Sequence, residues 1–150
     1  MRNICIVLGI VLSLILQTKV SIFGIAPEPM VIAAYYVGIN ATARKGMLVG
    51  SLMGVIEDSA VGGMIGPNLL GKGLVGFFSS SLFGGVFRWT PLLGMLVVFS
   101  LTIMDGFIVF LSQTFYETPP APWSKVILTI IIQGLVNAAI GGFIKPKNAE

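Results

Sequence analysis

The 150-residue sequence has no histidine, one cysteine and few charged residues. The absence of histidine removes the side chain that proteins use most often as a metal ligand and as a general base near neutral pH. The single cysteine, Cys5, can form no intramolecular disulfide, so it says nothing about the redox compartment. Only 10% of the residues are charged and 55% are hydrophobic, which is too little polar surface for a domain folded in water. The composition predicts an integral membrane protein, and the small net charge of +3 indicates no nucleic-acid partner.

The apolar residues fall into six stretches, which predict an all-α bundle of six transmembrane helices in a single domain, residues 1–150. The expected spans are about residues 3–18, 30–43, 46–65, 69–87, 92–112 and 126–144. The first span resembles a signal peptide, because Gly24 and Ala26 are small residues spaced as at a cleavage site. The polar residues 17–19, the proline that follows and the later spans instead favour an uncleaved helix.

The third span is the least regular, because residues 47–56 supply only about ten apolar residues where roughly 20 are needed to cross a bilayer. Glu57 and Asp58 follow directly, and a glycine-rich turn follows them. Either this short, glycine-rich helix continues to about Ile65 with both carboxylates buried, or the turn is re-entrant or lies at the surface. The fourth span carries Lys72 near its start, so Asp58 and Lys72 are expected at similar depth, where they could pair.

Ionisable groups inside apolar helices are the strongest functional signal here, since each costs at least roughly 2.5 to 3.5 kcal/mol to insert. The candidate residues are Glu57, Asp58, Asn68 and Lys72. Three interpretations remain open: these side chains reach water at the interface, form an internal ion pair or polar network, or face a partner or ligand. Asn68 is also placed to cap the fourth helix. Gln133 and Asn137 share a face of the last helix, which suits an interhelical hydrogen bond.

Glycines at four-residue spacing predict close helix packing. Gly50 and Gly54 form one such pair, and Gly62 and Gly66 form another. Faces of this kind let helix backbones approach each other, most often within one protein. The expected helix-packing glycines are Gly50, Gly54, Gly62, Gly66 and Gly76.

The basic residues indicate the topology, because cytoplasmic loops of membrane proteins carry an excess of lysine and arginine. On the side of the termini fall Arg2, Arg44, Lys45, Arg88, Lys145 and Lys147, whereas Lys19, Lys72 and Lys125 fall opposite. Both termini of this multi-pass protein are therefore expected in the cytoplasm.

No catalytic or cofactor site emerges from the motifs. The run from Gly66 to Gly73 has the spacing of a nucleotide-binding loop with Lys72 in place, but Gly73 replaces the hydroxyl residue that would bind Mg²⁺ and the flanks are membrane helices. Asp58 and Asp105 could share a proton like the dyad of lipoprotein signal peptidases, yet the asparagine-rich motifs of those enzymes are missing around Asp105. We expect a non-enzymatic protein with no cofactor and no metal.

The order of these features resembles the MreD family, the rod shape-determining membrane proteins of bacteria. The resemblance rests on Leu16-Gln17-Thr18 at the end of the first helix, Pro27-Glu28-Pro29 before the second, the basic turn Arg44-Lys45-Gly46 and the glycine-rich helix from Gly50 to Asp58. It continues through Asp58, Gly62, Gly66, Asn68, Leu70 and Gly76, and with the length and the number of spans it covers nearly the whole chain. Pro67 and the doubled Gly62-Gly63 depart from the family pattern.

This resemblance implies a scaffold of the cell-wall elongation machinery in the bacterial cytoplasmic (inner) membrane. The implied partners are an MreC-like bitopic membrane protein, the elongation peptidoglycan polymerase and transpeptidase, the lipid bilayer and, indirectly, the actin-like MreB. It also implies a fold similar to the substrate-binding subunits of energy-coupling-factor vitamin transporters, so solute binding is the alternative. An outer pocket lined by Glu57, Asp58, Asp105 and Trp123 would favour that alternative, and a closed bundle with an exposed apolar or glycine face would favour the scaffold.

Overall fold

The computed structural model describes residues 28–62, 64–83, 88–116 and 122–147. The expected first span, residues 3–18, lies outside this part of the chain. The described residues form five helices and no strand, which confirms the all-α prediction: α2 (Pro29–Ile39), α3 (Ala43–Val61), α4 (Pro67–Phe83), α5 (Pro91–Tyr116) and α6 (Trp123–Gly141). Two of these helices are long and apolar enough to cross a membrane, over Pro91–Phe115 and Trp123–Gly141, and Pro29–Ile39 is a shorter apolar helix.

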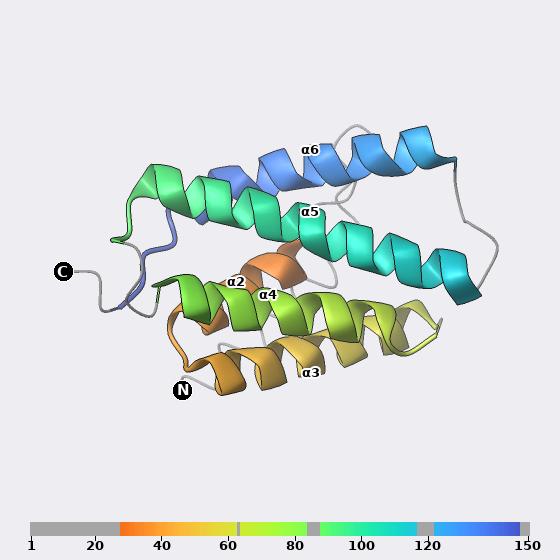
Figure 1. The fold of residues 1–150 in the computed structure, drawn as a ribbon, viewed down its shortest axis with the longest axis horizontal. Helices are drawn as coiled ribbons and strands as arrows, with labels where there is room; N and C mark the ends of the chain where they lie inside the picture. Colours follow the sequence, from red (N-terminus) through yellow and green to blue (C-terminus); the bar gives the residue numbers. More distant parts are fainter. Residues whose placement is uncertain (1–27, 63, 84–87, 117–121, 148–150) are drawn as a thin grey trace.

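The helices form two antiparallel hairpins with a short helix between them (Figure 1). Helices α3 and α4 make one hairpin, and α5 and α6 make the other. Helix α2 contacts α3 and α4 most extensively, and it also touches α5 and α6. Because α2 has only 11 residues, its N-terminus lies midway along the bundle rather than at an end. Glu28, the residue before α2, is thereby placed in the interior.

The boundary between α2 and α3 differs from the prediction. Helix α2 ends at Ile39 and α3 begins at Ala43, so the Arg44-Lys45-Gly46 segment forms the first turn of α3 rather than a loop. Thr42 is the N-cap residue in an extended conformation, a position where threonine is favoured. Helix α3 then continues past Glu57 and Asp58 to Val61, with both carboxylates buried, as the first possibility expects. It ends before Ile65, and an exposed glycine turn begins at Gly62, as the second possibility expects.

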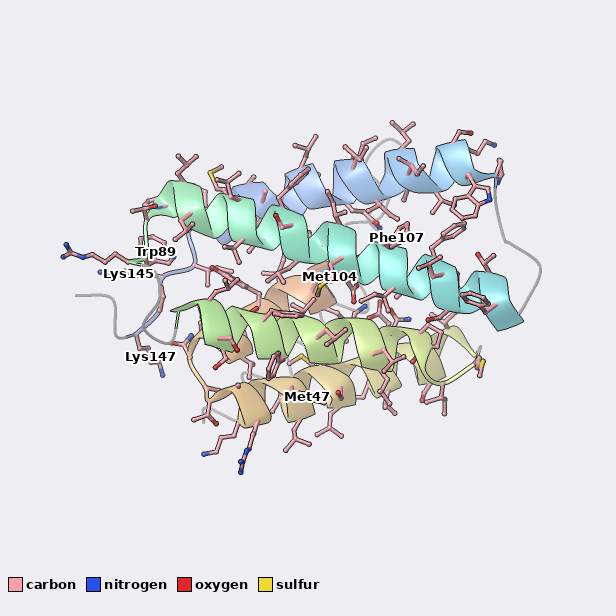
Figure 2. The ribbon with its side chains drawn as sticks, viewed as in Figure 1. Met47, Trp89, Met104, Phe107, Lys145 and Lys147 are labelled. Carbon is pink, nitrogen blue, oxygen red and sulfur yellow. The ribbon has the colours of Figure 1, made fainter. Side chains whose placement is uncertain are left out.

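The core lies where α2 meets the other helices. Its largest apolar contribution comes from α2, and the buried apolar cluster consists of Met30, Val31, Ala34, Tyr35, Met53, Val75, Val98 and Leu101. Met104 packs against this cluster from α5, whereas Met47 and Phe107 are about half exposed, at 48% and 49% (Figure 2). The outer faces of the long helices carry large apolar side chains throughout, as expected for surfaces that meet lipid.

Glycines bring α3 and α4 into backbone contact. A Cβ atom on Gly50 would collide with the carbonyl of Lys72, and one on Gly54 would collide with the carbonyl of Asn68. One turn earlier, Gly46 and Gly76 abut each other's backbone in the same way. The four-residue spacing on α3 therefore faces a matching spacing on α4, and the lysine lies in the middle of this contact.

Gly62 and Gly66 have a different role from the one expected. A Cβ on either would meet nothing within 4 Å, so neither is a packing glycine. Gly62 ends α3 with φ 72°, and Gly66 precedes α4 with φ 150°. Both backbone conformations are strained for any residue that carries a side chain, so the turn between the helices requires glycine at these two positions.

Candidate functional site: a buried charge network

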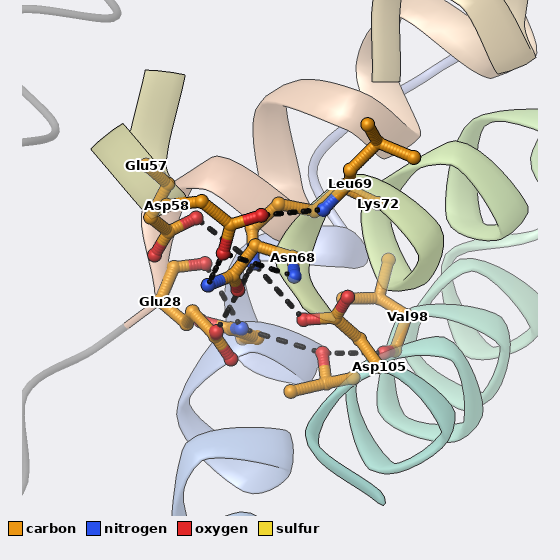
Figure 3. Close-up of polar contacts among 10 residues, drawn as sticks. Glu28, Glu57, Asp58, Asn68, Leu69, Lys72, Val98 and Asp105 are labelled. Atoms are coloured by element: carbon orange, nitrogen blue, oxygen red, sulfur yellow. Dashed lines mark hydrogen bonds and ion pairs between the residues drawn. The ribbon is translucent and has the colours of Figure 1, made fainter. Parts of the chain in front are cut away.

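Lys72 is the centre of the site. It lies on α4 with no exposed surface, and its Nζ is 2.7 Å from Asn68 Oδ1 and 2.9 Å from Glu57 Oε2. The same nitrogen is 3.2 Å from Asp105 Oδ2 and 3.4 Å from Glu28 Oε1. Figure 3 shows these side chains converging on one point from α2, α3, α4 and α5. One ammonium group thus joins four helices.

The backbone around Lys72 is closely packed, which explains why the side chain cannot reach the surface. Gly71 lies against the Asp105 carboxylate, and a Cβ there would collide with Oδ1. A Cβ on Gly73 would collide with the Ser51 hydroxyl, and the Lys72 carbonyl faces Gly50. The small residues on either side of the lysine bring α3 and α5 directly onto its own turn of α4.

Asp58 performs a separate task at the N-terminus of α4. Its carboxylate accepts hydrogen bonds from the backbone N–H groups of Gly66 (2.8 Å), Asn68 (3.2 Å) and Leu69 (3.2 Å). The first N–H groups of a helix have no partner within that helix, and the helix dipole favours a negative charge there. The predicted role of Asn68 is therefore corrected: Asn68 is the second residue of α4, and Asp58 caps the helix from α3.

Asn68 connects this cap to the lysine. Its Nδ2 donates to Asp58 Oδ1 at 2.8 Å, while its Oδ1 accepts from Lys72 Nζ at 2.7 Å. Asn68 and Lys72 are four residues apart, so they share one face of α4. The sequence raised a direct pairing of Asp58 with Lys72, and in the structure they are joined through the amide between them.

A neutral arm extends the network to α6. Asn137 Nδ2 donates to the backbone oxygen of Glu28 and to Thr102 Oγ1, both at 3.3 Å, and Thr102 donates to the Val98 carbonyl at 2.8 Å. Asn137 has no exposed surface, and Thr102 is 1% exposed. The network therefore joins α3, α4, α5, α6 and the N-cap residue of α2.

The charges in this network are buried and unequal in number. Within 4 Å of the one lysine lie the carboxylates of Glu28, Glu57 and Asp105, whose side chains are 15%, 9% and 0% exposed. Removing charges from water is costly, and attraction compensates only where partners are close. Once the network is assembled, removing one partner leaves the other charges buried without compensation. Because the partners come from both hairpins, the network favours the one docking arrangement that brings them together.

The sequence indicated four of these residues as candidates, and it predicted an interhelical hydrogen bond for Asn137, which bonds to Thr102. Glu57, Asp58, Asn68 and Lys72 all belong to one connected group. From the sequence, Glu28 stands out only in a proline-flanked motif, and Asp105 only as half of a catalytic pair or as the lining of an outer pocket. The signal for Asp105 was present, because a lone carboxylate in the longest apolar helix requires a partner. Asp105 lies beside Lys72 rather than Asp58, and among the described residues no group of three or more histidines, cysteines and carboxylates is arranged to hold a metal ion.

Comparison with known proteins identifies a family. A family model described as "rod shape-determining protein MreD" matches residues 1–140. No curated protein and no solved structure matches the chain significantly. The expected similarity to transporter substrate-binding subunits therefore has no support from a solved structure.

Proposed function

Since the chain belongs to the MreD family of rod shape-determining membrane proteins, we propose that it is a non-enzymatic scaffold of the cell-wall elongation machinery. Membership in the family assigns a role in rod shape determination. The proposal adds that the protein acts by binding an MreC-like bitopic membrane protein, and through it the peptidoglycan polymerase and transpeptidase, with actin-like MreB contacted indirectly. It also places a multi-pass bundle of six helices in the bacterial cytoplasmic membrane, with both termini in the cytoplasm.

The observation that supports a scaffold is the direction in which the polar groups face. Glu57, Asp58, Lys72 and Asp105 are at most 7% exposed as whole residues, and the hydrogen bonds and ion pairs described above join them to one another and to neighbouring polar groups. The outer surface is apolar along every long helix. A bundle held together from inside is suited to present rigid helix faces to other membrane helices.

Co-purification tests the partner. The tagged protein, extracted from native membranes in mild detergent, is expected to recover an MreC-like protein together with wall-synthesis enzymes. Recovery of ATPase subunits or of a bound small molecule, with no wall protein, would contradict the proposal. Lys125→Gln, a change at an exposed position, is the control and should recover the same partners as the wild type.

Photo-crosslinking then tests whether partners meet the outer surface. A photoreactive residue at Leu52 on α3 or at Leu135 on α6, which are 63% and 58% exposed, is expected to crosslink to the MreC-like protein from at least one of these faces. The matched control is the fully buried Val75 on α4. Crosslinking from Val75 as strong as from the exposed positions would exclude a rigid bundle recognised from outside.

A further inference from the structure

Five of the six exposed lysines and arginines in the described part of the chain gather at one end of the bundle, and the sixth, Lys125, lies at the other. This basic end is formed by Arg44, Lys45, Arg88, Lys145 and Lys147, all of which are exposed. Lys145 and Lys147 lie at this end together with Trp89 (Figure 2). In the part of the chain that the structure describes, the carboxylates are those of Glu28, Glu57, Asp58 and Asp105, all within the buried network. The basic end therefore has no described carboxylate to neutralise it.

The fold assembles this end from segments far apart in the sequence. The backbone N–H of Lys147 donates to the Asn40 side chain at 3.0 Å, which fixes the segment after α6 onto the end of α2. The Ser80 hydroxyl donates to the Ala41 carbonyl at 2.6 Å and ties α4 to the same turn. The cations on the first turn of α3 and those after α6 are consequently presented on one surface.

The cations on α3 do not serve their own helix. Arg44 and Lys45 lie in its first turn, where no acidic residue is present and where the helix dipole disfavours positive charge. The ion pairs among the described residues all involve Lys72, so neither cation has a carboxylate partner within that part of the chain. An external anion would compensate them.

Apolar side chains adjoin each basic segment. Leu48, three residues after Lys45, is 64% exposed, and Leu92, four residues after Arg88, is 67% exposed. Phe143, two residues before Lys145, is 89% exposed. A free phosphate ion would use only the cations, whereas a phospholipid presents an anionic headgroup next to acyl chains and matches both kinds of side chain.

We propose that the basic end binds the headgroups of anionic phospholipids. Basic clusters at one face of a membrane protein attract such headgroups electrostatically, and the attraction decreases with salt. The lipid holds the first turn of α3, Arg88 before α5 and the segment after α6 at the same membrane surface. This binding does not depend on whether the chain meets an MreC-like partner.

Native mass spectrometry of the purified protein, in detergent with equal amounts of phosphatidylglycerol and phosphatidylcholine, tests the proposal. The wild type is expected to retain phosphatidylglycerol preferentially. The fourfold variant Arg44→Gln/Lys45→Gln/Lys145→Gln/Lys147→Gln should abolish the preference. The pair Arg44→Gln/Lys45→Gln or the pair Lys145→Gln/Lys147→Gln alone should lower the preference at least about fivefold, which is the contribution of one basic side chain at an anionic surface. The control Lys125→Gln, at the opposite end, should leave the preference unchanged.

The proposal would be overturned by equal retention of both lipids by the wild type, by an unchanged preference in the fourfold variant, or by an equal loss in Lys125→Gln. Excess inorganic phosphate distinguishes the sources of the anion, because displacement of the lipid by phosphate would assign this end to a soluble ligand instead. Should the fourfold variant fail to fold, as judged by helicity and size-exclusion chromatography, the Lys145→Gln/Lys147→Gln pair carries the test. Those two side chains lie outside all helices, and the Lys147 contact with Asn40 uses the backbone.

Discussion

The two hairpins of the bundle pack by different means. In the α3–α4 hairpin, Gly46, Gly50 and Gly54 face the backbone of the opposite helix. In the α5–α6 hairpin, glycines mostly accept a side chain: Gly106 lies against Ile130, and Gly134 lies against the ring of Phe99. Backbone contact leaves no room for adjustment, whereas a side chain can change rotamer.

The hairpins also differ in how they suit a membrane. Helices α5 and α6 are long and apolar, and Asp105 is the one charged residue in the middle of α5. Helices α3 and α4 carry Glu57, Asp58 and Lys72 inside, where they would be costly in lipid. The charged α3–α4 hairpin therefore depends on the rest of the bundle, because Asp105 on α5 and Glu28 before α2 complete its network.

The largest effect is expected from Lys72→Met, which removes the cation from among three carboxylates. Loss of one partner from a buried ion pair costs about 3–5 kcal/mol. The free energy of unfolding, measured in bicelles, should fall by about this amount. The exposed Lys125→Gln serves as the control and should change it little, and equal stability of both variants would contradict the network.

A matched pair of alanine substitutions compares the two packing modes directly. Gly54→Ala forces a methyl group onto the Asn68 backbone, while Gly134→Ala meets the Phe99 ring at 3.0 Å. Overpacking costs about 1–3 kcal/mol, and the rigid contact should lie at the upper end of that range. Thermal unfolding should therefore rank Gly54→Ala as clearly more damaging, and the reverse ranking would refute the distinction.

A smaller effect is expected at the cap of α4. Asp58→Ala removes the acceptor of three backbone N–H groups, which should cost about 1–2 kcal/mol by analogy with lost helix caps. Ser59→Ala is the control, because that exposed hydroxyl bonds only to its own helix. Hydrogen exchange at Leu69 should increase in Asp58→Ala alone, and unchanged protection there would exclude the cap.

The smallest effect is expected at the neutral arm, where Asn137→Leu removes bonds to Thr102 and to the Glu28 backbone. Interhelical hydrogen bonds in membranes contribute about 0.6 kcal/mol on average. The unfolding free energy should fall by about this much, far less than in Lys72→Met. A loss as large as that of Lys72→Met would show that the network does not centre on the lysine.

The sequence predicted the all-helical class and much of the α3–α4 contact. Composition was sufficient for the class, and the spacing of Gly50 and Gly54 was sufficient for a packing face. Their partners on α4 could not be read, because a carbonyl such as that of Lys72 can receive a glycine whatever side chain the residue carries. The prediction that Gly62 and Gly66 pack against a helix was wrong, because spacing alone does not separate a packing glycine from a turn glycine.

The site was only partly predictable because its members meet across the fold. Glu57, Asp58, Asn68 and Lys72 lie within one hairpin, so local spacing brought them together. Asp105 is 33 residues from Lys72 and Glu28 is 44 residues away, and no local pattern connects them. Helix α2, which starts midway along the bundle, decides that Glu28 reaches the lysine.

A double-mutant cycle between Lys72 and Asp105 tests most directly whether buried charges dock the two hairpins. The unfolding free energy is measured for Lys72→Met, Asp105→Leu and the double variant in the same bicelles. Residues in one buried network show coupling of about 0.5–3 kcal/mol, so the double variant should be less damaged than the sum of the two single changes. Losses that add within about 0.3–0.5 kcal/mol would show that the two residues act independently, and would contradict this account.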